Sequence, residues 1–136
     1  MRRPRVDDWS RLLREAVERH RALPFRWGVS DCGIMASDCV RAVTGFDPLR
    51  GIRYVTKGGV IRAFREAGYA SATDLVSASF AEIDPAHAMR GDLGLPADVP
   101  DDLMSPAIIM GDVAISKNQV GPVIIPRSMI ARAWAV

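Results

Sequence analysis

The sequence has few residues suited to a metal site, a disulfide framework or a membrane span. It contains two cysteines and two histidines, and they do not fall at the spacing of a zinc site. Cys32 and Cys39 lie on one expected helix, whose rise would separate their Cα atoms by about 10 Å, too far for a disulfide. No apolar run approaches the roughly 18 residues that cross a bilayer. We therefore expect no bound metal, no cofactor and no membrane span.

The charge is nearly balanced, which disfavours a nucleic-acid-binding face. With 18 basic and 16 acidic residues the formal net charge is +2, so no broad basic surface is predicted. Arg2, Arg3 and Arg5 cluster at the start, and we interpret residues 1–6 as a flexible, solvated terminus, with contact to an acidic partner as the alternative. This start lacks the apolar stretch of a secretory signal. Synthesis in the cytoplasm, followed by release through lysis or within an assembled particle, fits this pattern.

Length and composition predict one domain over residues 1–136, with 49% hydrophobic and 25% charged residues. Helical periodicity and end signals predict helices over residues 8–20, 32–44 and 58–67, and favour a short helix over 71–80. Asp7 or Asp8 is the expected cap of the first helix. Short apolar runs follow, separated by turn residues, at 92–95, 107–110, 113–115 and 123–125. Gly111-Asp112 predicts a hairpin. Helices followed by strands indicate an α+β fold.

Cys32 holds the position best suited to chemistry. Ser30-Asp31 in front and Gly45 behind predict that the second helix begins at Cys32. Unpaired N–H groups and the helix dipole would point at the sulfur, an arrangement that lowers a thiol pKa from about 8.5 to between roughly 3.5 and 7.5. Such a thiolate is a nucleophile, and the amides can bind an oxyanion. The alternative is that Cys32, like Cys39 in mid-helix, is a small buried hydrophobic residue.

These residues carry a resemblance to a known family. Phe25-x-Trp27-Gly28 followed by Asp31-Cys32-Gly33 resembles the aromatic-x-Trp-Gly…Asp-Cys-Ser-Gly signature of NlpC-type cell-wall peptidases. Arg90-Gly91-Asp92-Leu93 resembles the Pro-Gly-Asp-Leu that precedes the family's histidine strand. Thr44-Gly45-x-Asp47-Pro48 and Ala133-Trp134 add a likeness to a branch of short phage and prophage proteins encoded among tail genes, including relatives in gene transfer agents. The resemblance implies a papain-like domain with N-terminal helices packed on a small antiparallel sheet, and Cys32 at the nucleophile position.

The family's histidine is the main departure from this pattern. Active members carry it at the start of the strand after Gly-Asp-Leu, in a run that ends in glycine. Aligning that glycine with Gly111 places Ser105 at the histidine position, and serine cannot accept a proton near neutral pH. Gly33 stands where the family usually has serine. We interpret His20 as a solvent-edge or helix-terminal residue, and His87 as an exposed loop residue or, if its loop folds back over Cys32, a replacement base.

Two functions from different classes fit these observations. The first is a structural or assembly component of a tailed phage or phage-like particle, near the tail tip, in which Cys32 is vestigial. Its expected partners are other tail proteins, contacted through the proline-rich segment 96–106 or the N-terminus, and its expected location is the virion. The second is an active cysteine peptidase or amidase that cleaves peptidoglycan peptides during DNA entry. The missing histidine favours the first.

Overall fold

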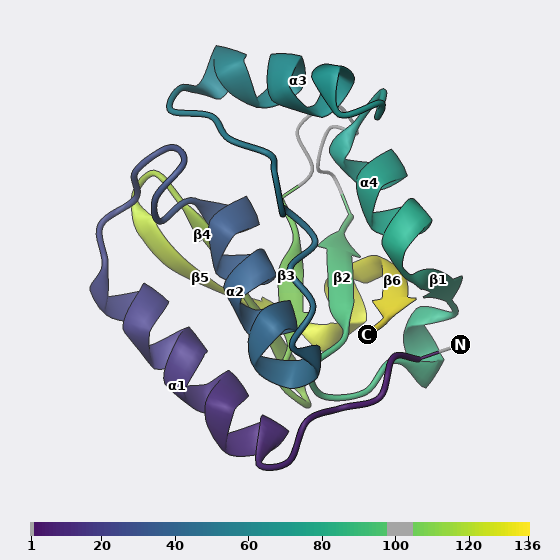
Figure 1. The fold of residues 1–136 in the computed structure, drawn as a ribbon. Coiled ribbons are helices and arrows are strands. Elements are labelled where there is room, and N and C mark those ends of the chain that lie inside the picture. The colour runs from purple at the N-terminus through teal and green to yellow at the C-terminus, as the bar shows by residue number, and fades with distance from the viewer. Residues whose placement is uncertain (1, 98–104) are drawn as a thin grey trace.

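The computed structural model describes residues 2–97 and 105–136, in which four α-helices precede most of an antiparallel sheet (Figure 1). The helices are α1 (Trp9–Ala22), α2 (Cys32–Thr44), α3 (Lys57–Glu66) and α4 (Ala72–Ser79). The strands are β1 (Ala81–Ile83), β2 (Leu93–Pro96), β3 (Ala107–Ile109), β4 (Val113–Asn118), β5 (Gly121–Pro126) and β6 (Ile130–Ala135). The described residues also include the 3₁₀ turns η1 (Pro85–His87) and η3 (Arg127–Met129). The α+β prediction is confirmed.

The sheet has six strands in the order β1-β6-β2-β3-β4-β5, and every neighbouring pair is antiparallel. The predicted hairpin at Gly111-Asp112 joins β3 to β4, and it is closed by a hydrogen bond from Met110 N to Val113 O at 2.9 Å. β1 and β6 were not predicted from the sequence. β1 precedes the first expected strand run at 92–95, so the sheet also includes a segment that lies before the predicted runs.

The core lies on both faces of the sheet, because side chains along a strand alternate between faces. Ile108 packs with buried residues of α1 and α2, such as Leu13 and Met35. Its neighbours Ala107 and Ile109 point the other way, into a smaller cluster with residues of β4 and β6. Burying a side chain the size of Met35 or Ile108 contributes about 1.5–3 kcal/mol. This packing fixes α2 against β3 and β4, and with it the position of Cys32.

Local side-chain caps define where most helices begin. Asp31 caps α2 by accepting from Ile34 N, Thr56 caps α3 and Ser71 caps α4. Helix α1 differs from the prediction, because Asp8 occupies the cap position with φ of 59° and its side chain makes no cap hydrogen bond. Within the described residues, no helix has the length and apolar character needed to cross a membrane.

The N-terminal segment is not the solvated terminus that the sequence suggested. Arg2 forms an ion pair with Asp92, and Arg5 donates to Asp92 Oδ1 at 3.2 Å. Asp92 is fully buried and also accepts from Met89 N at 2.9 Å and from Val136 N at 3.0 Å. One carboxylate therefore connects the two ends of the chain with the turn before β2.

Other contacts hold the same segment against the helices. The guanidinium of Arg3 lies 3.7 Å from the centroid of the Phe46 ring, and Val6 N donates to Val43 O at 2.9 Å. The arginines at the start are therefore engaged within the domain, and the expected contact of this segment with a partner stays a prediction. Most of the predicted loop 96–106 lies outside the described residues.

Candidate functional site

Cys32 lines a pocket at the N-terminal end of α2. The cavity measures about 110 Å³ and lies between α2, α3, α4 and the segments before α3 and β3. Its lining is mainly apolar, with Val40, Phe64, Leu75 and Leu93 among the contributors. In another protein, an apolar cavity of about 150 Å³ binds one benzene molecule. The smaller space beside Cys32 therefore suits one small apolar group. Its polar lining includes Asp31, Cys32 and Ser105, which the sequence had pointed to, and also Ser37 and Tyr54, which it had not.

Asp31 organises the loop in front of Cys32. Its carboxylate accepts from Gly28 N at 2.7 Å, from Ile34 N at 2.9 Å and from the Tyr54 hydroxyl at 3.0 Å, and it is 1% exposed. This carboxylate therefore caps α2 and ties the Trp-Gly loop to the segment before α3. The nearby negative charge raises the pKa of Tyr54, in addition to the larger effect of burial.

Gly28 is required where the two segments cross. Its φ is +76°, and a Cβ added there would lie 1.9 Å from the carbonyl oxygen of Tyr54. No side chain fits in that space unless one backbone moves. The Trp-Gly part of the motif therefore has a structural explanation, in which glycine permits the close approach of two backbones.

The Cys32 thiol is held in its neutral form. Burial is the larger cause and the charge of Asp31 the second, and together they raise the pKa of Cys32 to about 11. Hydrogen bonds from Ser105 and from the backbone of Gly33 and Cys32 act in the opposite direction but do not prevail. The low pKa expected from the helix dipole is therefore not found, because the dipole argument left out burial and the adjacent carboxylate.

Ser105 lies at the thiol, at the place where the sequence alignment put the family's histidine. Its hydroxyl forms a hydrogen bond with Cys32 and it lines the same pocket. A hydroxyl can donate to or accept from the sulfur, but it cannot serve as a base of near-neutral pKa.

Neither histidine lines the described pocket. His20 is 1% exposed, and its Nε2 lies 2.6 Å from Asp38 Oδ2. The expectation of a solvent-edge residue is wrong, because His20 faces α2 rather than water, but its alternative, a helix-terminal residue, is confirmed by the place of His20 in the last turn of α1. Burial opposes ionisation of Asp38, but its hydrogen bond with His20 and the attraction to that ring keep the pKa of Asp38 below its usual value. His87 is exposed at the end of η1 and does not reach the Cys32 pocket.

Lys117 was not identified from the sequence. It is 2% exposed on β4, and its Nζ donates to the carbonyl oxygen of His20 at 2.8 Å, in the last turn of α1. An ammonium group at this end of a helix is favourable because the carbonyls there carry partial negative charge. Burial lowers the pKa of Lys117, while the charge of Asp31 raises it. Its only sequence signal was a lysine within a strand-like run, which does not distinguish a buried amine from an exposed one.

Comparison with known proteins places the chain in a family. No curated protein matches the sequence. The described residues contain no group of three or more His, Cys, Asp or Glu side chains that could hold a metal ion. A family model described as "Domain of unknown function (DUF6950)" matches residues 4–136, nearly the whole chain, and the protein therefore belongs to the DUF6950 family.

Proposed function

We propose that this protein is a non-hydrolytic, NlpC-type papain-like domain that serves as a structural or assembly component of a tailed phage or phage-like particle, near the tail tip. The motif resemblance supports the fold and the setting. The position of Ser105 at the Cys32 thiol carries the proposal that hydrolysis is absent. Other tail proteins are its partners, and peptidoglycan is at most a surface that it meets.

The chemistry of the site supports a non-catalytic role. A cysteine peptidase needs a thiolate and a group that protonates the leaving amine. Here the pKa of Cys32 is about 11, so about one thiol in ten thousand is ionised at pH 7. Ser105 cannot supply the proton as an imidazolium would. General acid–base assistance is typically worth about a hundred- to ten-thousand-fold in rate.

The motif residues that match the family have structural tasks that do not depend on catalysis. Gly28 lets two backbones meet, Asp31 caps α2, and Asp92 joins the chain ends. Trp134 is fully buried and its Nε1 donates to Ser77 Oγ at 3.1 Å. Retaining the fold would therefore require these residues even in a domain that cleaves nothing, which is why the likeness does not argue for an enzyme.

A hydrolysis assay tests the absence of catalysis. Purified peptidoglycan peptides are incubated with the unmodified protein, with Cys32→Ala and with Ser105→His, and new amines are counted. We expect no difference between the unmodified protein and Cys32→Ala, and slow cleavage by Ser105→His. The matched control is Ser128→His, which adds an imidazole at an exposed position. Robust cleavage by the unmodified protein that Cys32→Ala abolishes would show that the protein is an enzyme, and His87→Ala would then test the base.

Particle composition tests the assembly role separately. We expect mass spectrometry of purified particles to detect the protein, and Cys32→Ala to be incorporated as well as the unmodified chain. A protein that is monomeric and absent from the particles contradicts the proposal even if it proves inactive as a peptidase.

A further inference from the structure

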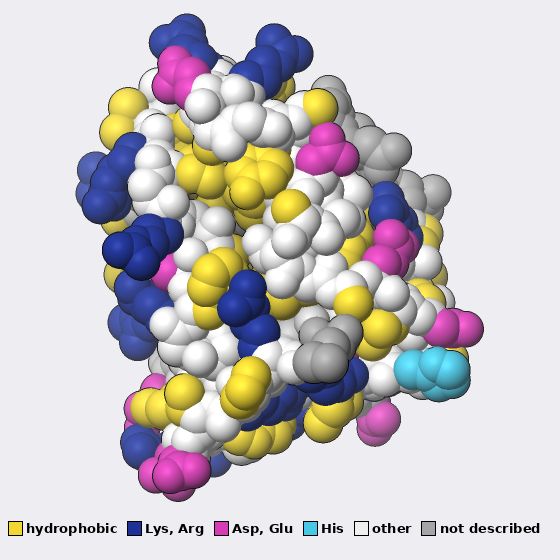
Figure 2. Space-filling view, turned by 45° about the vertical axis from the view of Figure 1, so that its right-hand side comes forward, with side chains coloured by type: hydrophobic (Ala, Val, Ile, Leu, Met, Phe, Trp, Pro, Cys, Tyr) yellow, Lys and Arg dark blue, Asp and Glu magenta, His cyan; other side chains and the backbone are white. Residues whose placement is uncertain are grey.

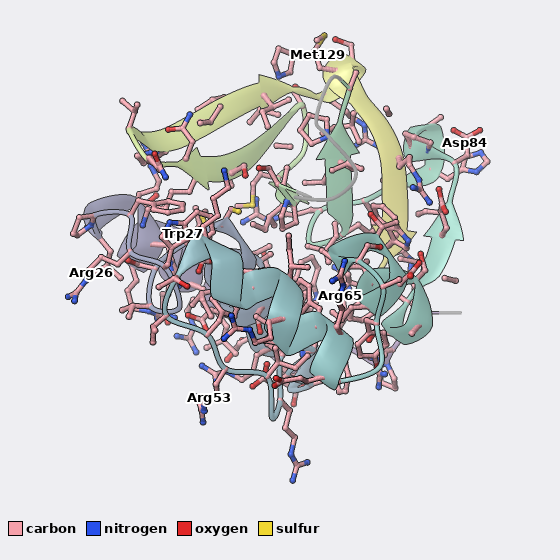
Figure 3. The ribbon with its side chains drawn as sticks, turned by 90° about the horizontal axis from the view of Figure 1, so that it is seen from above. Arg26, Trp27, Arg53, Arg65, Asp84 and Met129 are labelled. Atoms are coloured by element: carbon pink, nitrogen blue, oxygen red, sulfur yellow. The ribbon has the colours of Figure 1, made fainter. Side chains whose placement is uncertain are left out.

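Two loops at the mouth of the Cys32 pocket form one continuous surface. Residues 26–29 precede α2 and residues 53–57 lead into α3, and the closeness of Gly28 to the Tyr54 carbonyl brings their backbones into contact. Trp27 and Tyr54, one from each loop, line the pocket. We call the surface of these two loops the two-loop rim. Figure 3 shows Arg26 and Arg53 projecting outward from it.

The two-loop rim is positively charged. Arg26, Arg53 and Lys57 are exposed, and in the described part of the chain none of the three has an ion-pair or hydrogen-bond partner. Residues 48–65 contain five basic residues and no acidic one, although the whole chain has a net charge of only +2. Lys and Arg side chains gather along one side of the molecule and near α3 (Figure 2). This concentration of charge favours an acidic partner.

The same rim exposes apolar side chains beside an apolar cavity. Val55 is 81% exposed and Val29 is 56% exposed. Val55 follows Tyr54 directly and Val29 lies two residues after Trp27, and the cavity that Trp27 and Tyr54 line measures about 110 Å³. Apolar and aromatic side chains next to a pocket and surrounded by arginines are typical of a protein interface.

We propose that the two-loop rim binds an acidic segment of a partner protein and that one aliphatic side chain of this segment enters the Cys32 pocket. The inference rests on the proposed assembly function and specifies the chemistry of the partner. The volume favours a side chain over a lipid, since a cavity of about 150 Å³ holds one benzene and this one is smaller. The cations flank the pocket on two loops, so acidic residues on both sides of the anchor would meet them.

A peptide array tests this chemistry with the full chain. Short peptides carry a central leucine, isoleucine, methionine or serine, flanked by either glutamate and aspartate or lysine. We expect saturable binding of the acidic peptides with an aliphatic centre, weakening as salt is raised because the charges are exposed. Serine at the centre or lysine at the flanks should lower binding about tenfold or more.

Two variants and a matched control locate the contact. Arg53→Glu should weaken binding of the acidic leucine peptide about three- to tenfold, whereas Arg14→Glu, the same change on the exposed side of α1, should alter it less than about twofold. Ala36→Leu places a larger side chain in the pocket and should abolish the preference for leucine over serine. Thermal melts show whether Ala36→Leu is folded, and Arg53→Glu lies at an exposed position that leaves the core untouched.

Four results would overturn the inference: no saturable binding of the acidic leucine peptide, equal binding of the serine peptide, equal losses in Arg53→Glu and Arg14→Glu, or Arg53-dependent binding to phosphatidylglycerol vesicles without peptide binding. The last would indicate a membrane surface instead. These results are independent of the proposed function, which is judged by hydrolysis and by incorporation into particles. An inactive, incorporated protein that binds no acidic peptide contradicts this inference alone.

Discussion

Alkylation of Cys32 by iodoacetamide measures whether the thiol is held in its neutral form. The pKa of about 11, against an ordinary value of 9.0, lowers the thiolate fraction at pH 7 by about a hundredfold. A more basic thiolate is intrinsically more nucleophilic, and a Brønsted slope of about 0.4–0.5 recovers roughly eightfold of this. We therefore expect Cys32 to react about tenfold more slowly than a cysteine in an unstructured peptide, before any steric hindrance.

The assay follows the masses of the two cysteine peptides as a function of time and pH. Cys39 is 1% exposed, so the Cys32→Ser variant should incorporate almost no label while folded. The unmodified protein, once denatured, should react at both cysteines. The rate at Cys32 should rise about tenfold per pH unit until near pH 11. Asp31→Asn removes the charge that is the second cause of the raised pKa while keeping a residue that caps helices, so it should speed the reaction.

The reasoning fails if Cys32 reacts faster than the peptide at pH 7, or if its rate reaches a plateau near pH 8. Either result would show that the helix dipole and the amide hydrogen bonds prevail over burial. A cysteine peptidase would then regain its nucleophile, and the position of Ser105 alone would have to account for inactivity.

Three further predictions concern stability, each measured by denaturant unfolding. Gly28→Ala should lower the free energy of unfolding by about 3 kcal/mol or more, because the added Cβ meets the Tyr54 carbonyl. Gly51 has a similar positive φ but no atom within 4 Å of an added Cβ, so Gly51→Ala should lower it by only about 1–2 kcal/mol. Equal losses would rule out the proposed contact with Tyr54. Asp92→Asn should lose about 1.5–3 kcal/mol because it weakens the charge-assisted hydrogen bonds to Arg2 and Arg5, whose side chains are 32% and 12% exposed, whereas Glu82→Gln, at an exposed ion pair, should lose less than about 1 kcal/mol; a neutral Asp92→Asn would contradict its linking role. Finally, the pKa values of the Cys32 and Cys39 thiols are raised to about 11 and about 12, so above pH 9 the folded state retains protons that the unfolded state loses. The contribution of the two thiols to the free energy of unfolding should therefore be full below pH 9 and fall between pH 9 and 12. Replacing both cysteines by alanine should flatten this decline.

The sequence predicted the helical half of the fold well because its end signals are local. Asp31 and Gly45 bound α2 at the predicted residues. The strands were harder, since β1 has only three residues and is defined by its pairing with β6. Such pairing joins residues far apart in sequence, and no local pattern carries it.

The candidate site could be predicted in its members but not in its electrostatics. The spacing of Asp31, Cys32 and Ser105 brought the right residues together, because Ser105 contacts the thiol as the alignment implied. The state of the thiol depends on burial by α3 and α4 and on the orientation of one carboxylate. Arg2 and Arg5 were misjudged for the same reason, since the buried Asp92 that binds them lies about ninety residues further along the chain.

The free edges of the sheet bear on how a partner can bind. β5 is an edge strand that pairs with β4 along its whole length. Just beyond β5, Arg127 N donates to Asp112 O. Because the backbone groups of an antiparallel strand point alternately toward and away from its partner, the backbone N–H and C=O groups of the odd-numbered residues of β5 point toward β4. Pro122 and Pro126 therefore occupy outward positions, and proline has no N–H to offer. Ile124 remains as the one outward amide of the strand. Prolines at such an edge disfavour the addition of another strand. The opposite edge strand, β1, is only three residues long. Because neither edge presents a long row of backbone donors, the sheet edges do not favour the addition of a partner strand, and the proposed contact through side chains at the two-loop rim needs no such edge.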